Sequence, residues 1–335
     1  MIPVNTRTVA PLATRATTVL RKLSTIPPKL YQLAYLSHSD SRPRSVSTRA
    51  EIHDVSNGVT NCNLVHERAK YAACVQLLEW NASAYDQLPL PHQRWGRQAI
   101  RRLQLAGDET VMELGCGTGR DAELLLDALP NGRVVAVDGS EQMLAQLRHR
   151  LAGRMDRVTV VRADLRQSPR QPGLFDEPVD AVLSVATLHW LPDHDVVFQT
   201  VAASLRPGGR FVAEAGGTGN IERVRVALRT VDGSGGSSDG DGGQLWNFAG
   251  IEETTRRLQR AGFTDITVEL VPDSAVLERG EQFEAYLATV ILAAQLRDLP
   301  AHQRQPFVRA VARELDEPVV DYVRLQIDAT RASLP

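Results

Sequence analysis

A short glycine-rich segment could bring a ligand against the main chain. The segment Glu113-Leu-Gly-Cys-Gly-Thr-Gly119 contains the three glycines Gly115, Gly117 and Gly119. Glycine permits tight turns and has no Cβ to keep a ligand away, and backbone N–H groups at a helix start bind polar ligand atoms. The dinucleotide fingerprint G-x-G-x-x-G needs glycine at position 120, where this chain has Arg120. The spacing therefore disfavours a dinucleotide.

A carboxylate follows the next Val-rich run. Asp138 ends the run Val-Val-Ala-Val-Asp and is followed by Gly139. At the end of a strand, a carboxylate can accept hydrogen bonds from both ribose hydroxyls of a nucleoside. The alternative interpretation is an acid that caps the next helix. Asp138 alone does not choose between nucleoside cofactors, because all of them present a ribose.

One histidine follows a predicted strand at the edge where parallel sheets bind ligands. His189 and Trp190 come after the run 179–185, and an imidazole there could act as a general base. The alternative is that both rings only pack at the strand end. His92 and His194 are weaker candidates, and we expect them at the surface.

Strand and helix patterns alternate around these residues. Val-rich strands that alternate with helices predict an α/β fold, a mostly parallel seven-stranded sheet with helices on both faces. The expected strands are 110–114, 133–137, 158–162, 179–185 and 209–215, and the expected helices are 63–80, 93–105, 121–129, 141–151 (with Ser140 as N-cap) and 195–205.

The pattern changes beyond Gly216. Residues 233–243 are rich in Gly, Ser and Asp and predict a mobile loop. A helix over 252–261, a sixth strand over 265–271, two helical stretches over 282–298 and 303–315, and a seventh strand over 319–327 follow.

Composition bounds the class of protein. A net charge of -2 argues against a dedicated nucleic-acid binder, and no apolar run is long enough to span a bilayer. The three cysteines are spaced irregularly, so we expect neither a disulfide framework nor a metal site.

Residues 1–55 have the composition of either a disordered leader or a mitochondrial transit peptide. We expect a cytoplasmic protein, or a mitochondrial one if that segment is a transit peptide.

The ordered motifs resemble those of class I S-adenosylmethionine-dependent methyltransferases. The glycine segment with its acid at Glu113 resembles motif I of that family, and Leu205-Arg-Pro-Gly-Gly-Arg-Phe-Val212 resembles its turn into the fifth strand. The resemblance implies a Rossmann-like core with S-adenosylmethionine as cofactor. It assigns cofactor contacts to Glu113, Gly115, Gly117, Gly119, Asp138, Gly139, Met143, Asp164 and Leu165, with Asp164 at the adenine amino group and Met143 against the adenine ring.

A narrower resemblance comes from the segment Trp80-Asn-Ala-Ser-Ala-Tyr85. It is similar to the entry segment of the trans-aconitate methyltransferase-like group, which implies that Trp80 and Tyr85 close over the cofactor. Trp95 and Trp190 would line an acceptor pocket, although core packing explains either equally well. We expect four sections: 1–55 outside the fold, N-terminal helices over 60–105, the cofactor-binding core over 106–220, and a C-terminal section over 221–335 with a helical lid.

These features favour methyl transfer to a small molecule, most simply O-methylation of a carboxylate or hydroxyl. A carboxylate acceptor needs no base, whereas a phenol, hydroxyl or carbon acceptor could use His189. C-methylation of a lipophilic natural product, an indole or a prenyl chain of bacterial secondary metabolism, is the alternative. Converging arginines in the pocket would favour O-methylation, and an aromatic pocket beside His189 would favour C-methylation.

An NAD(P)-dependent oxidoreductase is less favoured, because no lysine follows Lys70 to form a Tyr-x-x-x-Lys pair. A non-catalytic binding protein is the third possibility.

Overall fold

The computed structural model describes residues 79–87, 91–167, 177–232 and 245–333. All of them belong to one compact unit, Thr60–Pro335. The leader, the Gly-rich loop and all but the last two residues of the helix expected over 63–80 lie outside the described residues, and those two residues, 79 and 80, are not helical. None of the helices in the described part combines the length and the apolar character that a membrane span needs.

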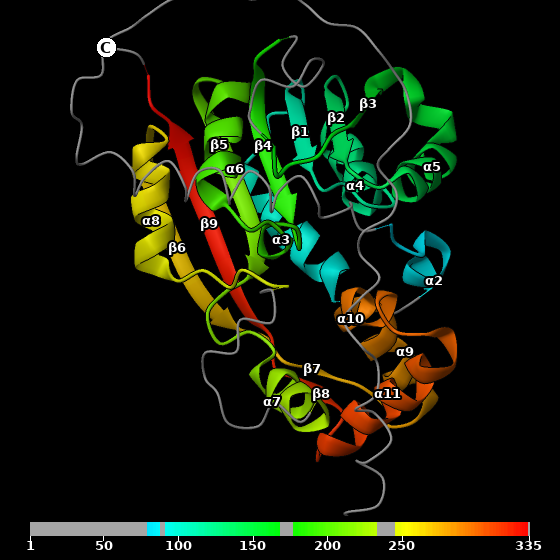
Figure 1. Ribbon diagram of the computed structural model, residues 1–335. Helices are drawn as coiled ribbons and strands as arrows, with labels where there is room; N and C mark the ends of the chain where they lie inside the picture. Colours follow the sequence, from blue (N-terminus) through cyan, green and yellow to red (C-terminus); the bar gives the residue numbers. More distant parts are fainter. Residues whose placement is uncertain (1–78, 88–90, 168–176, 233–244, 334–335) are drawn as a thin grey trace, which may run out of the picture. The chain divides into compact units, whose positions relative to one another are not determined.

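A seven-stranded sheet forms the centre of this unit (Figure 1). The strand order is β3-β2-β1-β4-β5-β9-β6; β9 runs antiparallel to both of its neighbours, and the pairs among β1 to β5 are parallel. The predicted mostly parallel sheet is therefore confirmed. Its strands are β1 Thr110–Leu114, β2 Arg133–Asp138, β3 Val158–Arg162, β4 Val179–Val185, β5 Leu205–Gly216, β6 Phe263–Pro272 and β9 Val323–Arg331, and a separate ladder joins β7 Ala275–Val276 to β8 Val319–Val320.

Helices cover both faces of the sheet because successive strand residues point to opposite sides. In β1, Val111 joins the apolar cluster under α3, α4 and α5, whereas Met112 joins the cluster under α6 and α8. These helices are α3 His92–Leu103, α4 Arg120–Ala128, α5 Glu141–Arg150, α6 His194–Ser204 and α8 Ile251–Arg260. The remaining ones are α2 Ala82–Gln87, α7 Glu222–Val231, α9 Glu281–Tyr286, α10 Ala293–Arg297 and α11 Ala301–Glu314, with short 3₁₀ turns η1 Ala152–Arg157 and η2 Leu188–Trp190.

Helices α2 and α7 and the short strand β7 were not expected, and two of the expected elements differ in the structure. The helix expected over 282–298 is interrupted by the π-helical turn η3, Leu287–Ile291. The strand expected over 319–327 is divided into β8 and β9, because Asp321 turns the chain: its carbonyl accepts the N–H of Ile221, and its side chain accepts the N–H of Arg223.

Candidate active site

A cleft of about 1040 Å³ lies at the carboxyl edge of the parallel strands. The loops after β1, β2 and β4 meet at this edge, and the antiparallel β9 begins there. The lining runs from Gly117 and Asp138 at one end to Tyr322 and Arg324 at the other. Ligand cavities in proteins span roughly 300–1,000 Å³, so this one has room for a cofactor together with a small second ligand.

The loop after β1 has the backbone that only glycine adopts readily. Gly115 has φ +73°, and a Cβ on it would lie 2.0 Å from the Thr187 hydroxyl oxygen. Gly119 has φ +81° and packs against Leu147 at the start of α4. Gly117 has open space around its α-carbon and lines the cleft. The first and last glycines thus shape the loop, and the middle one leaves room for a ligand.

Asp138 holds this loop and the start of α5. One carboxylate oxygen accepts the N–H of Gly117 at 2.9 Å, and the other accepts the N–H of Ser140 at 2.8 Å. Burial raises the pKa of Asp138, although these backbone N–H groups oppose the rise. Each oxygen keeps a further lone pair, so the carboxylate can still accept hydroxyl groups from the cleft.

Asp164, the second candidate carboxylate, is oriented by Arg166, which no sequence pattern singles out. Arg166 donates to both oxygens of Asp164, from Nε at 2.9 Å and from Nη2 at 2.8 Å. Burial raises the pKa of Asp164, but the hydrogen bonds from Arg166 outweigh it and keep this pKa below its usual range. Asp164, Leu165 and Met143 line the same part of the cleft as Gly139.

Helix α2 is fastened to the glycine loop through Asp86. Its carboxylate accepts hydrogen bonds from the Thr118 hydroxyl at 2.9 Å, from Arg120 Nε at 2.9 Å and from Arg150 Nη2. These contacts hold the segment that begins with Trp80 against the cofactor end of the cleft, which Trp80 lines.

His189 lies in η2, directly after β4, with a defined tautomer. The Gly216 N–H donates to His189 Nδ1 at 3.2 Å, so the ring proton of the neutral imidazole sits on Nε2. Burial, helped by the charge of Arg324, lowers the pKa of His189 well below its usual range. A neutral ring whose only lone pair faces Gly216 donates a hydrogen bond and takes up no proton, which differs from the expected general base.

Arg324 brings a buried positive charge to the far end of the cleft. Its side chain is 2% exposed, and its guanidinium carbon lies 3.7 Å from the centre of the Trp95 ring. The nearest described carboxylate, Glu214, is completely buried with an oxygen 3.6 Å from Arg324 Nε, and Arg102 approaches the same group at 3.7 Å. Burial lowers the pKa of Arg324, but a guanidinium stays charged at neutral pH.

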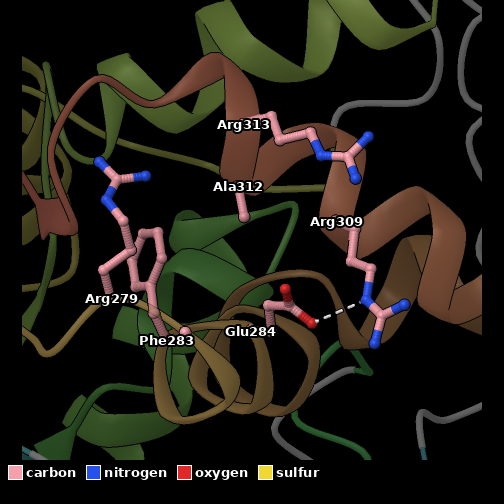
Figure 2. A pocket seen from close by; sticks show the side chains of 7 residues that line it. Arg279, Phe283, Glu284, Arg309, Ala312 and Arg313 are labelled. Carbon is pink, nitrogen blue, oxygen red and sulfur yellow. Dashed lines mark hydrogen bonds and ion pairs between the residues drawn. The ribbon is translucent and has the colours of Figure 1, made fainter.

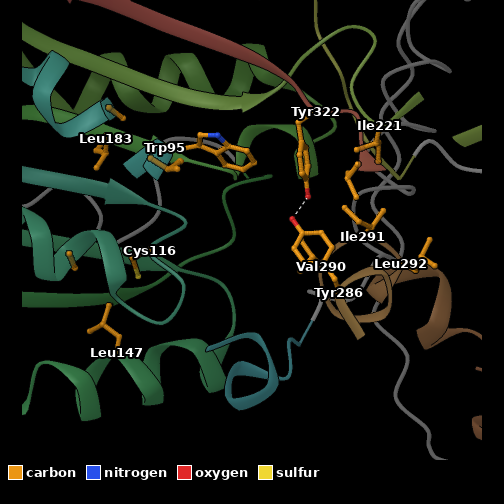
Figure 3. Close-up of a cluster of buried hydrophobic side chains, with 14 of the residues drawn as sticks. Trp95, Cys116, Leu147, Leu183, Ile221, Tyr286, Val290, Ile291, Leu292 and Tyr322 are labelled. Carbon is orange, nitrogen blue, oxygen red and sulfur yellow. Dashed lines mark hydrogen bonds between the residues drawn. The ribbon is translucent and has the colours of Figure 1, made fainter. Parts of the chain in front are cut away.

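Aromatic rings form one wall of the cleft, between its Asp138 end and its Arg324 end. Trp80 meets Trp190 edge-to-face with ring centres 5.3 Å apart, and Trp246 is parallel to Phe248 within 8° at 5.9 Å. The opposite wall carries aliphatic side chains from η3 and α10, among them Val290 and Ile291. Figure 3 shows these side chains near Tyr322, whose hydroxyl meets that of Tyr286 at 2.6 Å.

Comparisons with known proteins agree with this geometry. Residues 111–209 match the family described as methyltransferase domain. The match confirms the resemblance seen in the motifs, and the matched segment contains the glycine loop, Asp138, Asp164 and His189.

Curated relatives narrow the resemblance. Trans-aconitate 2-methyltransferase of Variovorax paradoxus (strain S110) is 32% identical over 133 residues, 40% of this chain and 48% of the relative. The enzyme of that name from Azoarcus sp. (strain BH72) is 35% identical over 131 residues, 39% and 48% of the two chains. The chain thus spans about half the length of these relatives. The YcgJ protein of Bacillus subtilis shares the fold, with a TM-score of 0.52, 13% identity and coverage of 72% of this chain and 100% of that one.

Some residues that were expected at the cleft lie elsewhere. Trp95 is fully buried, donates its indole N–H to Asp273 and is not among the residues that line the cleft, so it supports Arg324 from behind. Glu113 is buried beneath the loop, where burial and the charges of Asp121 and Asp138 raise its pKa. Tyr85 belongs to α2, but its side chain is outside the described part of the structure.

The two weaker histidine candidates, His92 and His194, are not surface residues. His194 is buried, and its Nε2 donates to the Leu188 carbonyl at 2.8 Å, which steadies the turn that carries His189. His92 lines the cleft, and burial, with the charges of Arg324 and Arg120, lowers its pKa to about 3. Both were expected to be exposed because the sequence does not reveal which elements cover them.

A second hollow of about 360 Å³ lies between α9 and α11 (Figure 2). Arg279, Arg309 and Arg313 surround it, and Glu284 already pairs with Arg309 at 3.2 Å. These arginines are exposed, and Arg279 donates to the backbone carbonyls of Leu315 and Asp316. We assign this hollow no chemistry. Among the described residues, no group of three His, Cys, Asp or Glu side chains could hold a metal ion.

Proposed function

We propose that this protein transfers a methyl group from S-adenosylmethionine to the carboxylate of a small molecule. The observation that carries the proposal is the hydrogen bond from Gly216 to His189 Nδ1, beside the buried charge of Arg324. His189 and Arg324 offer the cleft hydrogen-bond donors and a positive charge. Neither has a free lone pair that could take up a proton.

The glycine loop end of the cleft fits the cofactor. Asp138 has free lone pairs for ribose hydroxyls, Gly117 leaves space at the main chain, and Met143 and Leu165 provide apolar surface for a flat base. S-adenosylmethionine would supply a methyl group activated by a positively charged sulfur. An ionised carboxylate can take that methyl with no proton to remove, so the protein mainly has to orient the two partners.

Names of the curated relatives support the same acceptor chemistry. Both are trans-aconitate 2-methyltransferases, and trans-aconitate carries carboxylates. Because the similarity spans about half of those proteins, we carry over only the reaction type. The aliphatic wall from η3 and α10 supports the idea that the C-terminal helices form a lid over the acceptor.

Binding and turnover test the proposal separately. Titration calorimetry should show binding of S-adenosylhomocysteine and S-adenosylmethionine but none of NADH, and Asp138→Ala should weaken S-adenosylhomocysteine about tenfold or more. Incubation with small carboxylic acids should then yield methyl esters, detected by mass spectrometry. Failure to bind S-adenosylhomocysteine would refute the cofactor assignment, and binding without ester formation would refute the carboxylate acceptor.

C-methylation of a lipophilic molecule is the second candidate, because aromatic rings stand beside His189. Such a reaction must remove a proton, so it predicts that kcat/KM rises with pH through the titration of a base. Carboxylate methylation predicts a flat profile between pH 6.5 and 8.5, because both the acid and His189 keep their charge states there. A rise in kcat/KM that His189→Gln abolishes would favour C-methylation.

A further inference from the structure

The arginines of the cleft differ in how completely they are paired. Three of them each have a carboxylate of their own within about 3 Å. These pairs are Arg166–Asp164 at 2.8 Å, Arg257–Glu253 at 2.7 Å and Arg297–Asp298 at 3.1 Å. Arg324 shares Glu214 with Arg102 at longer distances, and its Nε and Nη2 have no hydrogen-bond partner among the described residues. Arg257 also has one nitrogen, Nη1, without a hydrogen-bond partner, but it has a carboxylate at 2.7 Å. Arg324 is therefore the cleft arginine whose charge is least neutralised by a carboxylate of its own.

Gly216 brings Arg324 and His189 to the same point. Gly216 is the ladder partner of Arg324 between β5 and β9, and its N–H binds His189 Nδ1. A side chain at 216 would collide with Asn220 and Phe248, because a Cβ would lie 2.6 Å and 2.8 Å from their atoms. The Arg324 and His189 side chains both line the cleft, and the charge of Arg324 acts on the His189 ring.

The surfaces next to this pair are apolar. Trp190, Trp246 and Phe248 line one side, and Val290, Ile291 and Ala294 line the other. Trp246 and Phe248 are stacked, with their ring planes within 8° of each other. A further carboxylate placed against these rings would be buried without a partner, which is costly. An apolar body would instead gain contact on both sides.

We infer that the acceptor chamber binds a monocarboxylic acid with a flat, apolar body, anchored by Arg324 and His189 and packed against Trp246 and Phe248. The inference rests on the proposed function, because it places this acid next to the methyl donor. It differs from the tricarboxylate in the names of the curated relatives. The π-helical turn η3 contributes to specificity, because it places Val290 and Ile291 in the opposite wall.

Three probes test the inference on the full chain saturated with S-adenosylhomocysteine. Cinnamate has one carboxylate and a flat body, cinnamyl alcohol has that body without the charge, and trans-aconitate has three carboxylates. Calorimetry should show cinnamate binding at least tenfold more tightly than either of the others. If trans-aconitate binds as tightly as cinnamate or more tightly, the inference is wrong. If cinnamyl alcohol binds as tightly as cinnamate, Arg324 and His189 do not anchor the carboxylate.

Variants assign the two parts of the site. Trp246→Ala should weaken cinnamate about tenfold and leave S-adenosylhomocysteine unchanged, and Trp246→Phe should restore most of that loss. Arg324→Met should bring cinnamate down to the affinity of cinnamyl alcohol. The single change leaves the Glu214 carboxylate buried beside one remaining arginine, Arg102. The double variant Arg324→Met with Glu214→Gln removes both buried charges, and the same measurement is repeated on it. Ile251→Ala, on exposed helix surface away from the cleft, is the control.

The binding and turnover results separate the two proposals. If cinnamate binds selectively but no methyl ester forms, the ligand class stands and carboxylate methylation fails. If esters form from trans-aconitate as efficiently as from cinnamate and Trp246→Ala changes neither, the methyltransferase stands and the flat monoacid is refuted.

Discussion

At the residue scale, two glycines separate the cost of a left-handed backbone from the cost of a steric overlap. Gly115 and Gly208 have nearly equal backbone angles, φ +73° and +76°, but differ in surroundings. A Cβ at Gly115 would overlap Thr187, whereas a Cβ at Gly208 meets nothing within 4 Å. We therefore expect Gly208→Ala to cost only the left-handed backbone penalty, about 1–2 kcal/mol.

Gly115→Ala should cost more than Gly208→Ala and also affect ligand binding. The added methyl group has to push Thr187 away, and this disturbs the turn between β4 and His189 as well as the loop. We expect S-adenosylhomocysteine binding to fall at least a hundredfold in Gly115→Ala and to stay unchanged in Gly208→Ala. Urea unfolding and calorimetry of both variants measure this, and equal losses in the two would contradict the steric argument.

Asp121 makes stability depend on pH. Burial raises its pKa to about 7, with Glu214 adding to the rise and Arg120 opposing it. Because the folded pKa exceeds the ordinary value of 3.8, the stabilising contribution is complete below about pH 4 and is lost as the pH rises through 7. Relative to Asp121→Asn, the native protein should lose up to about 1.4 kcal/mol per pH unit in that window.

The measurement is urea unfolding of both proteins from pH 4.5 to 8. Using the difference between them cancels the other groups that titrate in this range, including the histidines with lowered pKa. A difference in unfolding free energy that stays constant with pH would show that Asp121 is ionised throughout.

At the scale of elements, helix α2 depends on one carboxylate. It has only six residues, too few to be stable alone, and Asp86 ties it to α4 and α5. Asp86→Ala should release the segment that carries Trp80 and weaken S-adenosylhomocysteine about tenfold, as measured by calorimetry. Asp127→Ala is the control, because Asp127 forms an exposed pair with Arg154 far from the loop. Unchanged affinity in Asp86→Ala would mean that α2 does not cover the cofactor.

The elements of the sheet could be predicted because their signals are local. Val-rich strands flanked by capped helices mark β1 to β5, and Ser140 caps α5 as expected, accepting the Met143 N–H at 3.3 Å. The π-turn in η3 could not be predicted, because no proline or glycine marks it. Packing decides it: Leu287, Val290 and Ile291 all join the core cluster.

The cofactor end of the site could be predicted far better than the acceptor end. Asp138 and the glycines occur in a fixed order along the chain, whereas Trp246 and Phe248 follow a stretch without periodicity. Their position depends on long-range hydrogen bonds, such as that from the Asn247 N–H to the His189 carbonyl at 2.8 Å. Arg324 was missed because it lies in a strand, where a buried arginine is rare and has no sequence signature.

At the scale of the whole described unit, the two ends of the cleft form one continuous space. Gly117 and Asp138 share it with Trp190 and Arg324. A cofactor bound at the loop end would take up part of this space and would then form one side of the acceptor chamber. Binding should therefore be ordered, with the cofactor first and the acid second.

Thermal unfolding in the presence of ligands tests this order. A ligand at a hundred times its dissociation constant stabilises the folded state by about 2.7 kcal/mol. S-adenosylhomocysteine alone should raise Tm, and cinnamate alone should leave it nearly unchanged. Cinnamate added to the S-adenosylhomocysteine complex should raise Tm further, and by reciprocity it should tighten S-adenosylhomocysteine by the same factor that S-adenosylhomocysteine tightens cinnamate. If cinnamate binds equally well with and without S-adenosylhomocysteine, the protein alone forms the complete acceptor chamber and the coupling between the two ends of the cleft is absent.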